Sequence, residues 1–363
     1  MMLSTDLKVD KMLVNIGVHR GLFSENFFTK DPEGAKRCHA IVADLLLRHG
    51  RVVFDSPTSK NEFAKIVKSR SMMPYWEKVI NKSTVKSSSG VPWWMITSTK
   101  DFSSRDDGLE ILLVELDTVQ QIFSINATLS HEHHKVCVTR CDTPGEPEGL
   151  ENLVRMANCR YGQNELDQNI VRKNYIEPFL KESSRTVIMD KFIGYVLDKT
   201  NLKWFWQLLR NSRSDHGQRE LKIITTIPKH FPTEKNDLIE CLQERQESLI
   251  GDCLGDDSNL ESVKIYWLYE WKWSFKGKHD RHIRFDDRVI EISSGYEVLS
   301  APQKTDAHFT YWVKDTRHTA YATITSEEKR ASNAASYHFR STYIHDMLKT
   351  TMIPTKTQRK RTY

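Results

Sequence analysis

Short apolar segments alternate with amphipathic segments through the first part of the chain, and this pattern most narrows the possible folds. Residues 11–18 and 51–55 are typical of buried strands. Between them, residues 32–49 place apolar side chains every three or four positions, as a helix with one buried face does, and Gly50 ends the pattern. A second helix is expected over residues 60–69. Strands that alternate with helices predict an α/β unit.

The chain is 363 residues long, which favours two domains. A linker is predicted over residues 142–149, where prolines and glycines gather. We therefore expect an α/β domain of unknown role over residues 1–150, a second α/β domain over 160–325, and a C-terminal helix and basic tail over 326–363. Within the second domain residues 166–181 are amphipathic, and we expect helices over residues 197–210 and 235–250 and strands over 187–189 and 221–226. Residues 263–269 follow the last of these helices.

Composition limits the classes of protein to which the chain can belong. Its net charge of +5 permits a nucleic-acid or anionic-lipid partner without requiring one. No apolar run reaches the roughly 18 residues of a membrane span, and the N-terminus lacks a signal-peptide pattern. The six cysteines are scattered and form no disulfide framework, so a reducing, cytoplasmic setting is expected. We expect no cofactor and no bound metal.

The segment with the clearest chemistry runs from Lys278 to Arg288 and is followed by a strand-like run ending in Ser293-Ser294-Gly295. On an extended chain His279, Arg281, Ile283 and Phe285 alternate onto one face, which places an imidazole beside a guanidinium. Asp286-Asp287 reads as a turn, with a returning strand after it. A cation can hold phosphoryl oxygens while the imidazole attacks phosphorus or transfers a proton. The segment therefore predicts phosphate chemistry.

The spacing His279-x-Arg281-x4-Asp286 resembles the H-x-K-x4-D motif of the phospholipase D superfamily, with Arg in place of the usual Lys. Over residues 174–315 the chain also resembles the C-terminal, phospholipase-D-like domain of MIT-domain-containing proteins, which carries an H-D-R-x-I-x-F motif. The order helix, strand, helix, strand before the motif agrees with that domain. This resemblance implies that the second domain is a single phospholipase-D-like unit, a mixed sheet flanked by helices.

The resemblance implies a metal-independent nuclease or related phosphodiesterase that acts on nucleic acid through a phosphohistidine at His279. Arg281 would bind the phosphate and Asp286 would orient the site. Because the superfamily uses two motifs and this chain has one, two half sites would meet in a homodimer. Ser293 and Ser294 would hold a phosphoryl oxygen. Three lysines would line the approach to the site as further phosphate-binding groups: Lys272, Lys276 and Lys278.

Two alternatives stay open. In the first, the second domain does not catalyse but binds anionic lipid headgroups, nucleic acid or a protein partner; the missing second motif and Arg281 favour it. In the second, the N-terminal domain is a metal-dependent nuclease whose carboxylates follow or flank predicted strands. Those carboxylates are Asp55, Glu62, Glu115 and Asp117.

Two further clusters are interpreted as structural. The run from His131 to Cys141 contains histidines and cysteines, but its spacing matches no familiar zinc pattern. Trp271-Lys272-Trp273 is expected to be a strand with both indoles turned inward, although interleaved aromatic and cationic side chains can also stack bases and neutralise phosphates.

Overall fold

A computed structural model shows that the chain has an α/β fold and divides into two compact units, Met1–Ala157 and Asn158–Tyr363. Each unit contains its own sheet and helices. The structure describes residues 14–25, 29, 31–87, 90–102, 109–114, 118, 121–122, 131–133, 136–140, 160–161, 171–195, 203–212, 217, 219–253, 259–273, 281–292, 309–315, 319–344 and 347–353.

The first unit is built on a sheet with the strand order β3-β2-β1-β4-β6-β5, in which only β5 runs antiparallel to its neighbour. Three helices and three short 3₁₀ turns accompany these strands in the described part of the unit. The elements are β1 (Val14–Val18), η1 (Arg20–Phe23), α2 (Pro32–His49), β2 (Gly50–Phe54), α3 (Pro57–Ser69), α4 (Met73–Lys82), β3 (Thr84–Val85), η2 (Trp93–Met95), η3 (Thr99–Phe102), β4 (Ile111–Val114), β5 (His131–His133) and β6 (Val136–Arg140).

Local signals explain where the helices of this unit begin. The Asp31 side chain accepts a hydrogen bond from the backbone N–H of Gly34 at 2.9 Å and so caps α2, whose predicted bounds are confirmed. Helix α3 begins earlier than predicted because Ser56 caps it. Helix α4 was not predicted; Pro74 lies in its first turn, where proline does not interrupt a helix.

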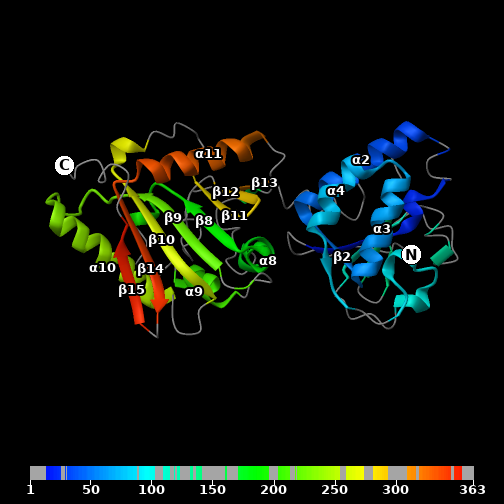
Figure 1. Ribbon diagram of the computed structural model, residues 1–363, viewed down its shortest axis with the longest axis horizontal. Helices are drawn as coiled ribbons and strands as arrows, with labels where there is room; N and C mark the ends of the chain where they lie inside the picture. The colour runs from blue at the N-terminus through cyan, green and yellow to red at the C-terminus, as the bar shows by residue number, and fades with distance from the viewer. Residues whose placement is uncertain are drawn as a thin grey trace. The chain divides into compact units, whose positions relative to one another are not determined.

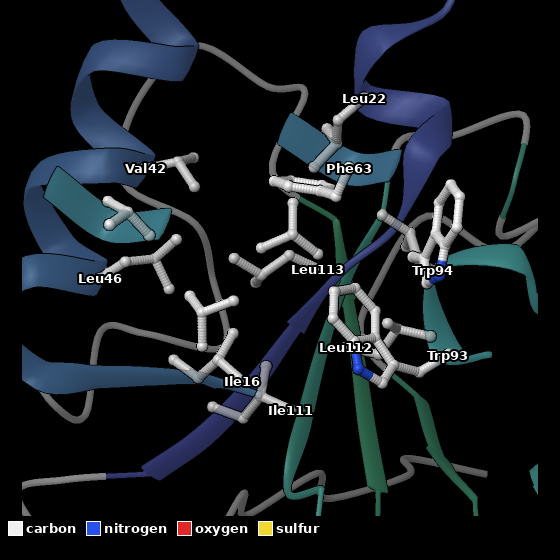
Figure 2. Close-up of a cluster of buried hydrophobic side chains, with 14 of the residues drawn as sticks. Ile16, Leu22, Val42, Leu46, Phe63, Trp93, Trp94, Ile111, Leu112 and Leu113 are labelled. Atoms are coloured by element: carbon white, nitrogen blue, oxygen red, sulfur yellow. The ribbon is translucent and has the colours of Figure 1, made fainter. Parts of the chain in front are cut away.

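The core of the first unit lies on both sides of its central strands. Figure 2 shows Val42 and Leu46 of α2 pointing toward the strands, with Trp93 beside Leu112. The segment around Trp93 and Trp94 is a buried 3₁₀ turn. Burial of these apolar side chains at about 25 cal/mol per Å² is the main stabilising contribution to such a core.

Buried histidines in this unit have structural partners. His39 contacts the backbone oxygen of Leu22 through Nε2 at 3.0 Å and accepts a hydrogen bond from Trp76 at Nδ1. Burial lowers the pKa of His39 to about 4, although the contact with the Leu22 carbonyl opposes this. His39 is therefore neutral at pH 7 and acts as a hydrogen-bonding element of the core.

The second unit is built on a mixed sheet with the order β15-β14-β10-β9-β8-β11-β12-β13-β7. Strands β8, β9 and β10 are parallel, and the remaining pairs are antiparallel. Its elements are β7 (Arg160–Tyr161), η5 (Val171–Ile176), α8 (Glu177–Glu182), β8 (Arg185–Met189), η6 (Ile193–Tyr195), α9 (Lys203–Asn211), β9 (Arg219–Thr226), α10 (Lys235–Cys253), β10 (Leu260–Leu268), η8 (Glu270–Lys272), β11 (His282–Phe285), β12 (Arg288–Ile292), β13 (Phe309–Asp315), α11 (Thr319–Ala334), β14 (Tyr337–Ile344) and β15 (Met347–Met352).

Helices lie on both faces of this sheet (Figure 1). Ala331 of α11 and Ala335, just after the helix, pack against Val187, Met189, Ile224 and Leu268, which share one face. Gln246 of α10 donates a hydrogen bond to Ser341 at 2.7 Å, and Ser341 belongs to the other face. The two faces of β8, β9 and β10 therefore pack against different helices, as expected for an α/β sheet.

The predicted C-terminal helix and basic tail over residues 326–363 is wrong for residues 337–344 and 347–352, which are strands. Residues 326–334 belong to α11, as the predicted helix requires, but β14 and β15 then extend the sheet beyond β10. Residues Phe339 and Ala335 are fully buried there. The second unit thus continues through Met352 and includes the part of the chain that had been predicted as a tail. Residues 354–363, with the terminal basic cluster, lie outside the described residues.

Candidate functional site

The site is organised by the hairpin of β11 and β12, which confirms the predicted turn and returning strand. β11 lies between β8 and β12 and runs antiparallel to both. Asp286 and Asp287 form the two-residue connection, and Asp286 adopts a positive φ of 46°. Two-residue hairpin turns require this left-handed conformation, which Asp tolerates better than most residues.

Asp286 has a structural role at this turn. Its carboxylate accepts hydrogen bonds from the backbone N–H groups of Ser184 and Arg185 at 2.8 and 2.9 Å, at the start of β8. Its carbonyl oxygen accepts further hydrogen bonds from Arg284 and Tyr321. Arg281 lies at the opposite end of β11, about 16 Å away for five residues of extended chain. The prediction that Asp286 orients a site at Arg281 stays a prediction, because the described hydrogen bonds of Asp286 all lie at the turn and none of them reaches Arg281.

The two faces of β11 carry different side chains. Ile283 and Phe285 are buried on one face, where Phe285 stacks on Phe179 of α8 with ring centroids 5.7 Å apart. His282 and Arg284 occupy the other face. The alternation predicted for Arg281, Ile283 and Phe285 is confirmed for the latter two by their burial.

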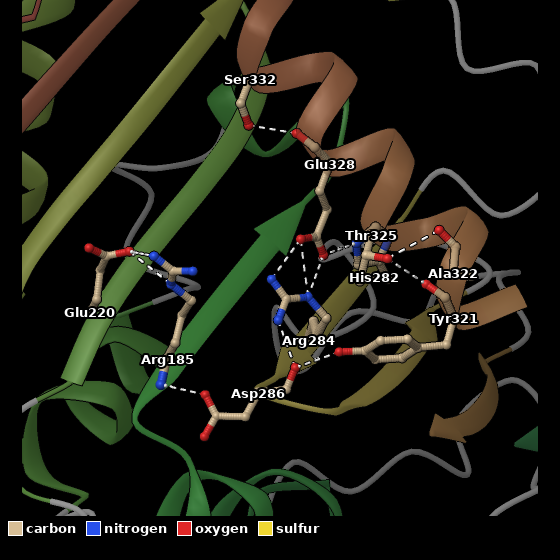
Figure 3. A network of polar contacts seen from close by, with 10 residues as sticks. All are labelled: Arg185, Glu220, His282, Arg284, Asp286, Tyr321, Ala322, Thr325, Glu328 and Ser332. Carbon is tan, nitrogen blue, oxygen red and sulfur yellow. Dashed lines mark hydrogen bonds and ion pairs between the residues drawn. The ribbon is translucent and has the colours of Figure 1, made fainter. Parts of the chain in front are cut away.

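His282 and Arg284 form a buried network with Glu328 of α11 (Figure 3). Nε2 of His282 lies 3.1 Å from a Glu328 oxygen, and Arg284 donates to both Glu328 oxygens at 2.7–3.1 Å. Burial would raise the pKa of Glu328, but the hydrogen bonds from His282 and Arg284, together with their charges, outweigh it and hold the value at about 2. This network fixes β11 against α11.

Sequence reasoning missed this network. His282-x-Arg284 repeats the H-x-R spacing of His279-x-Arg281 three residues later, so the sequence did contain a signal for it. Glu328, its acidic partner, is 44 residues beyond Arg284, and no local pattern connects the two. Because His282 and Glu328 are 1% and 3% exposed, these groups hold the fold rather than meet a substrate.

Arg281 directly precedes β11 and lies beside the carboxyl end of β8. Its guanidinium lies over the ring of Phe192, 5.2 Å from the ring centroid, and Phe192 is 41% exposed. The Lys191 ammonium lies at the same distance from that centroid. Among the described residues, none accepts a hydrogen bond from Nε of Arg281 and no carboxylate forms an ion pair with its guanidinium. Nε of Arg281 is buried, and within the described residues the charge of its guanidinium has no carboxylate partner.

The loop after β8 that carries Phe192 is held rigidly. The Asp190 carboxylate accepts hydrogen bonds from the backbone N–H groups of Phe192 and Ile193 at 2.6 and 3.0 Å. Gly194 donates to the Thr225 hydroxyl at 2.9 Å, and a Cβ at Gly194 would lie 2.6 Å from a backbone oxygen of β9. The position of the Phe192 ring, which contacts the cationic groups of Lys191 and Arg281, is therefore fixed by the loop.

A second loop, after β10, completes the same edge of the sheet. Glu270 pairs with Lys191 at 2.9 Å and with Lys229 at 3.0 Å, which links the two loops. Trp271 is 77% exposed, and the Lys272 ammonium lies 5.3 Å from its ring centroid. The prediction of a strand at Trp271-Lys272-Trp273 is wrong, because η8 forms there and turns Trp271 outward. The inward orientation predicted for Trp273 is confirmed, because Trp273 packs against the buried core of this unit.

We call this surface the carboxyl-edge patch and define it by residues from the loops after β8, β9 and β10 and from the start of β11. Its cations outnumber its carboxylates, since Glu270 and the buried Asp190 face four cationic groups. Ligands of α/β sheets bind outside the carboxyl ends of the parallel strands. The members of the patch are Lys191, Phe192, Lys229, Glu270, Trp271, Lys272 and Arg281.

Of the predicted phosphate-binding residues, the structure describes Arg281 and Lys272 and brings both to this edge. The other five lie outside the described residues, so their predicted roles stay predictions: Lys276, Lys278, His279, Ser293 and Ser294.

The predicted carboxylates of the N-terminal domain do not form a metal site within the described residues. Asp55 follows β2 and Glu62 lies in α3, but no three His, Cys, Asp or Glu side chains in the described ranges come together to bind a metal. Glu115 and Asp117 lie outside those ranges, as do the side chains of the His131–Cys141 cluster.

The described helices include none that is both long and apolar enough to cross a membrane. Comparison of the chain with known protein families, with curated proteins and with solved structures found no match in any of the three.

Proposed function

We propose that the second unit binds the phosphodiester backbone of a single-stranded nucleic acid at the carboxyl-edge patch. The single observation that carries this proposal is Arg281, whose guanidinium lies over the exposed Phe192 ring and forms no ion pair with a carboxylate among the described residues. A guanidinium binds a phosphate with paired hydrogen bonds. Exposed aromatic rings beside such cations stack bases without regard to sequence.

The arrangement of the patch favours a strand over a compact anion. Phe192 and Trp271 are exposed on two different loops, each with a cation close to its ring. The loops follow strands that lie two positions apart in the sheet, so the two rings can contact separate bases of one strand. Anionic lipid headgroups are the alternative ligand, because they present the same phosphate chemistry to Arg281.

A second candidate function is cleavage of the bound phosphodiester at His279. It is favoured by the position of Arg281 at the start of β11, since His279 precedes it by two residues and an extended chain would turn both the same way. His279 would attack phosphorus and expel an oxygen, and a second His279 from a homodimer partner would protonate it. Cleavage that persists in excess EDTA supports this function, and cleavage that requires a metal contradicts it.

Fluorescence anisotropy of a labelled oligonucleotide tests the binding proposal with the full chain. Arg281→Met should weaken binding about ten- to a hundredfold, because a charge-assisted hydrogen bond contributes roughly 1.5–3 kcal/mol. Trp271→Ala should also weaken it, by roughly 1–3 kcal/mol for one stacked base. The matched control is Lys181→Met, which removes an exposed cation from α8 at the other end of the parallel strands and should have no effect.

Two results would contradict the proposal. One is a wild-type chain that does not bind the oligonucleotide. The other is an Arg281→Met variant that binds as tightly as wild type. If the chain instead sediments with phosphatidylserine vesicles and ignores the oligonucleotide, the lipid alternative replaces the nucleic-acid one.

A further inference from the structure

Three cationic side chains lie in a row across the middle of the second unit's sheet, on the face that packs against α11. The strand register places Lys222 of β9 directly opposite Lys264 of β10, and Lys264 directly opposite Arg340 of β14. Neighbouring strands are about 4.8 Å apart, and side chains of opposite residues point to the same face. Like charges in such cross-strand positions destabilise a sheet. We call these three residues the cation row.

Few carboxylates are available to neutralise the row. Glu220, on the same face of β9, pairs with Lys264 but also with Arg185 of β8, whose terminal nitrogen lies 2.7 Å from the same carboxylate. Glu328 of α11 acts on Lys222 from a distance, but Arg284 and His282 already occupy its oxygens. The face therefore carries a surplus of positive charge within the described residues.

The surplus of positive charge affects the pKa of the neighbouring His338. Burial first, and then the charges of Lys264, Lys222 and Arg340, lower the pKa of His338 to about 4, against an opposing effect of Glu220. His338 stacks on Tyr266 with ring centroids 4.0 Å apart. Nε2 of His338 and Nε of Arg340 are both buried, and neither has a hydrogen-bond partner among the described residues. Buried polar atoms of folded proteins are normally hydrogen-bonded, and a bound anion would supply an acceptor to the Arg340 donor.

We propose that the cation row is a binding site for a phosphate or diphosphate group, held between Lys222, Lys264 and Arg340. The row spans two strand spacings, about 10 Å, which accommodates one phosphate or two linked phosphates. A dianionic group would offset the repulsion along the row and supply an acceptor for the free Arg340 donor. The proposal does not depend on the carboxyl-edge patch, because the two sites share no residue.

Calorimetric titration of the full chain with pyrophosphate, at low and constant ionic strength, tests the site. The wild type should bind pyrophosphate, and inorganic phosphate more weakly. Lys222→Met and Arg340→Met should each weaken pyrophosphate binding at least tenfold, whereas Lys181→Met should not. A nucleoside diphosphate that binds more tightly than pyrophosphate would identify a phosphorylated metabolite as the ligand, and equal affinity would identify the free anion.

The cation row and the carboxyl-edge patch can be separated in the same experiment. Arg281→Met should keep the pyrophosphate binding of the cation row, even where it loses oligonucleotide binding. The inference is overturned if the wild type does not bind pyrophosphate, if Lys222→Met and Arg340→Met both bind it as the wild type does, or if Arg281→Met abolishes the binding.

Discussion

Replacing Glu328 by glutamine removes the negative charge at the centre of the buried network that holds β11. The substitution keeps the shape of the side chain but leaves Arg284 buried without its counter-charge. Removing one partner of a buried ion pair lowers the free energy of unfolding by about 3–5 kcal/mol, largely because the remaining charge stays desolvated.

The pKa of Glu328 gives an independent magnitude. A carboxyl group whose pKa falls from 4.5 in the unfolded chain to about 2 in the folded protein stabilises the fold by about 3 kcal/mol at pH 7. Because the folded value is the lower one, this stabilisation is complete above pH 4.5 and is lost as the pH falls toward 2. Both routes give a loss near 3 kcal/mol for Glu328→Gln.

Thermal and urea unfolding of the second unit at pH 7 measure this loss. A change of about 3 kcal/mol should lower the melting temperature of a unit of this size by roughly 6–12 °C. The control is Glu327→Gln, which removes the neighbouring, less buried carboxylate of α11 and should change the melting temperature little. Between pH 4.5 and 2, Glu328→Gln should also lose less stability than the wild type.

Two outcomes would refute this reasoning. If Glu328→Gln unfolds at the same temperature as Glu327→Gln at pH 7, the network does not hold β11. If the wild type and Glu328→Gln lose the same stability on acidification to pH 2, then the carboxylate of Glu328 is not responsible for the predicted pH dependence.

Three further predictions concern the second unit, and urea unfolding measures each. Asp286→Ala should lower the free energy of unfolding by about 2–3 kcal/mol, because the N–H groups of Ser184 and Arg185 lose their acceptor. Oligonucleotide binding should survive this substitution, and loss of binding would support a functional role for Asp286. Lys222→Met should raise the free energy of unfolding at pH 7 by up to about 3 kcal/mol, because burial lowers the pKa of Lys222 to about 8. This gain should vanish as the pH rises from 8 to 10.5, and a lower stability of the variant at pH 7 would contradict the prediction. Arg219→Met should cost at least about 3 kcal/mol, because the fully buried guanidinium donates to backbone carbonyls at the ends of α8 and α9; an unchanged midpoint would contradict this.

The sequence predicted those parts of the fold that depend on neighbouring residues. The turn at Asp286-Asp287 and the strand after it could be predicted because turn chemistry and apolar alternation are local signals. Helix α2 could be predicted from its apolar spacing and its end at Gly50. The extent of the second unit could not, because β14 joins the sheet by pairing with β10, which lies 70 to 80 residues earlier in the chain.

The site was predicted less completely than the fold, for the same reason. Arg281 and Lys272 could be selected as cations near a phosphate motif, and both lie at the carboxyl edge. Phe192, which lies beneath Arg281, belongs to a loop 89 residues earlier and becomes its neighbour only through the pairing of β11 with β8. The structural contacts of Asp286 could not be predicted, because its carboxylate meets the N–H groups of Ser184 and Arg185 only through the pairing of β11 with β8.

The salt dependence of oligonucleotide binding by the wild type and by Arg281→Met tests the central claim most directly. Each phosphate contact to a single strand contributes about 0.7 to the slope of log affinity against log salt concentration. If Arg281 binds a backbone phosphate, Arg281→Met should reduce the magnitude of the slope by about 0.7 and weaken binding to oligonucleotides of every sequence. Lys181→Met should leave slope and affinity unchanged. An Arg281→Met variant with the wild-type slope and affinity would contradict the account.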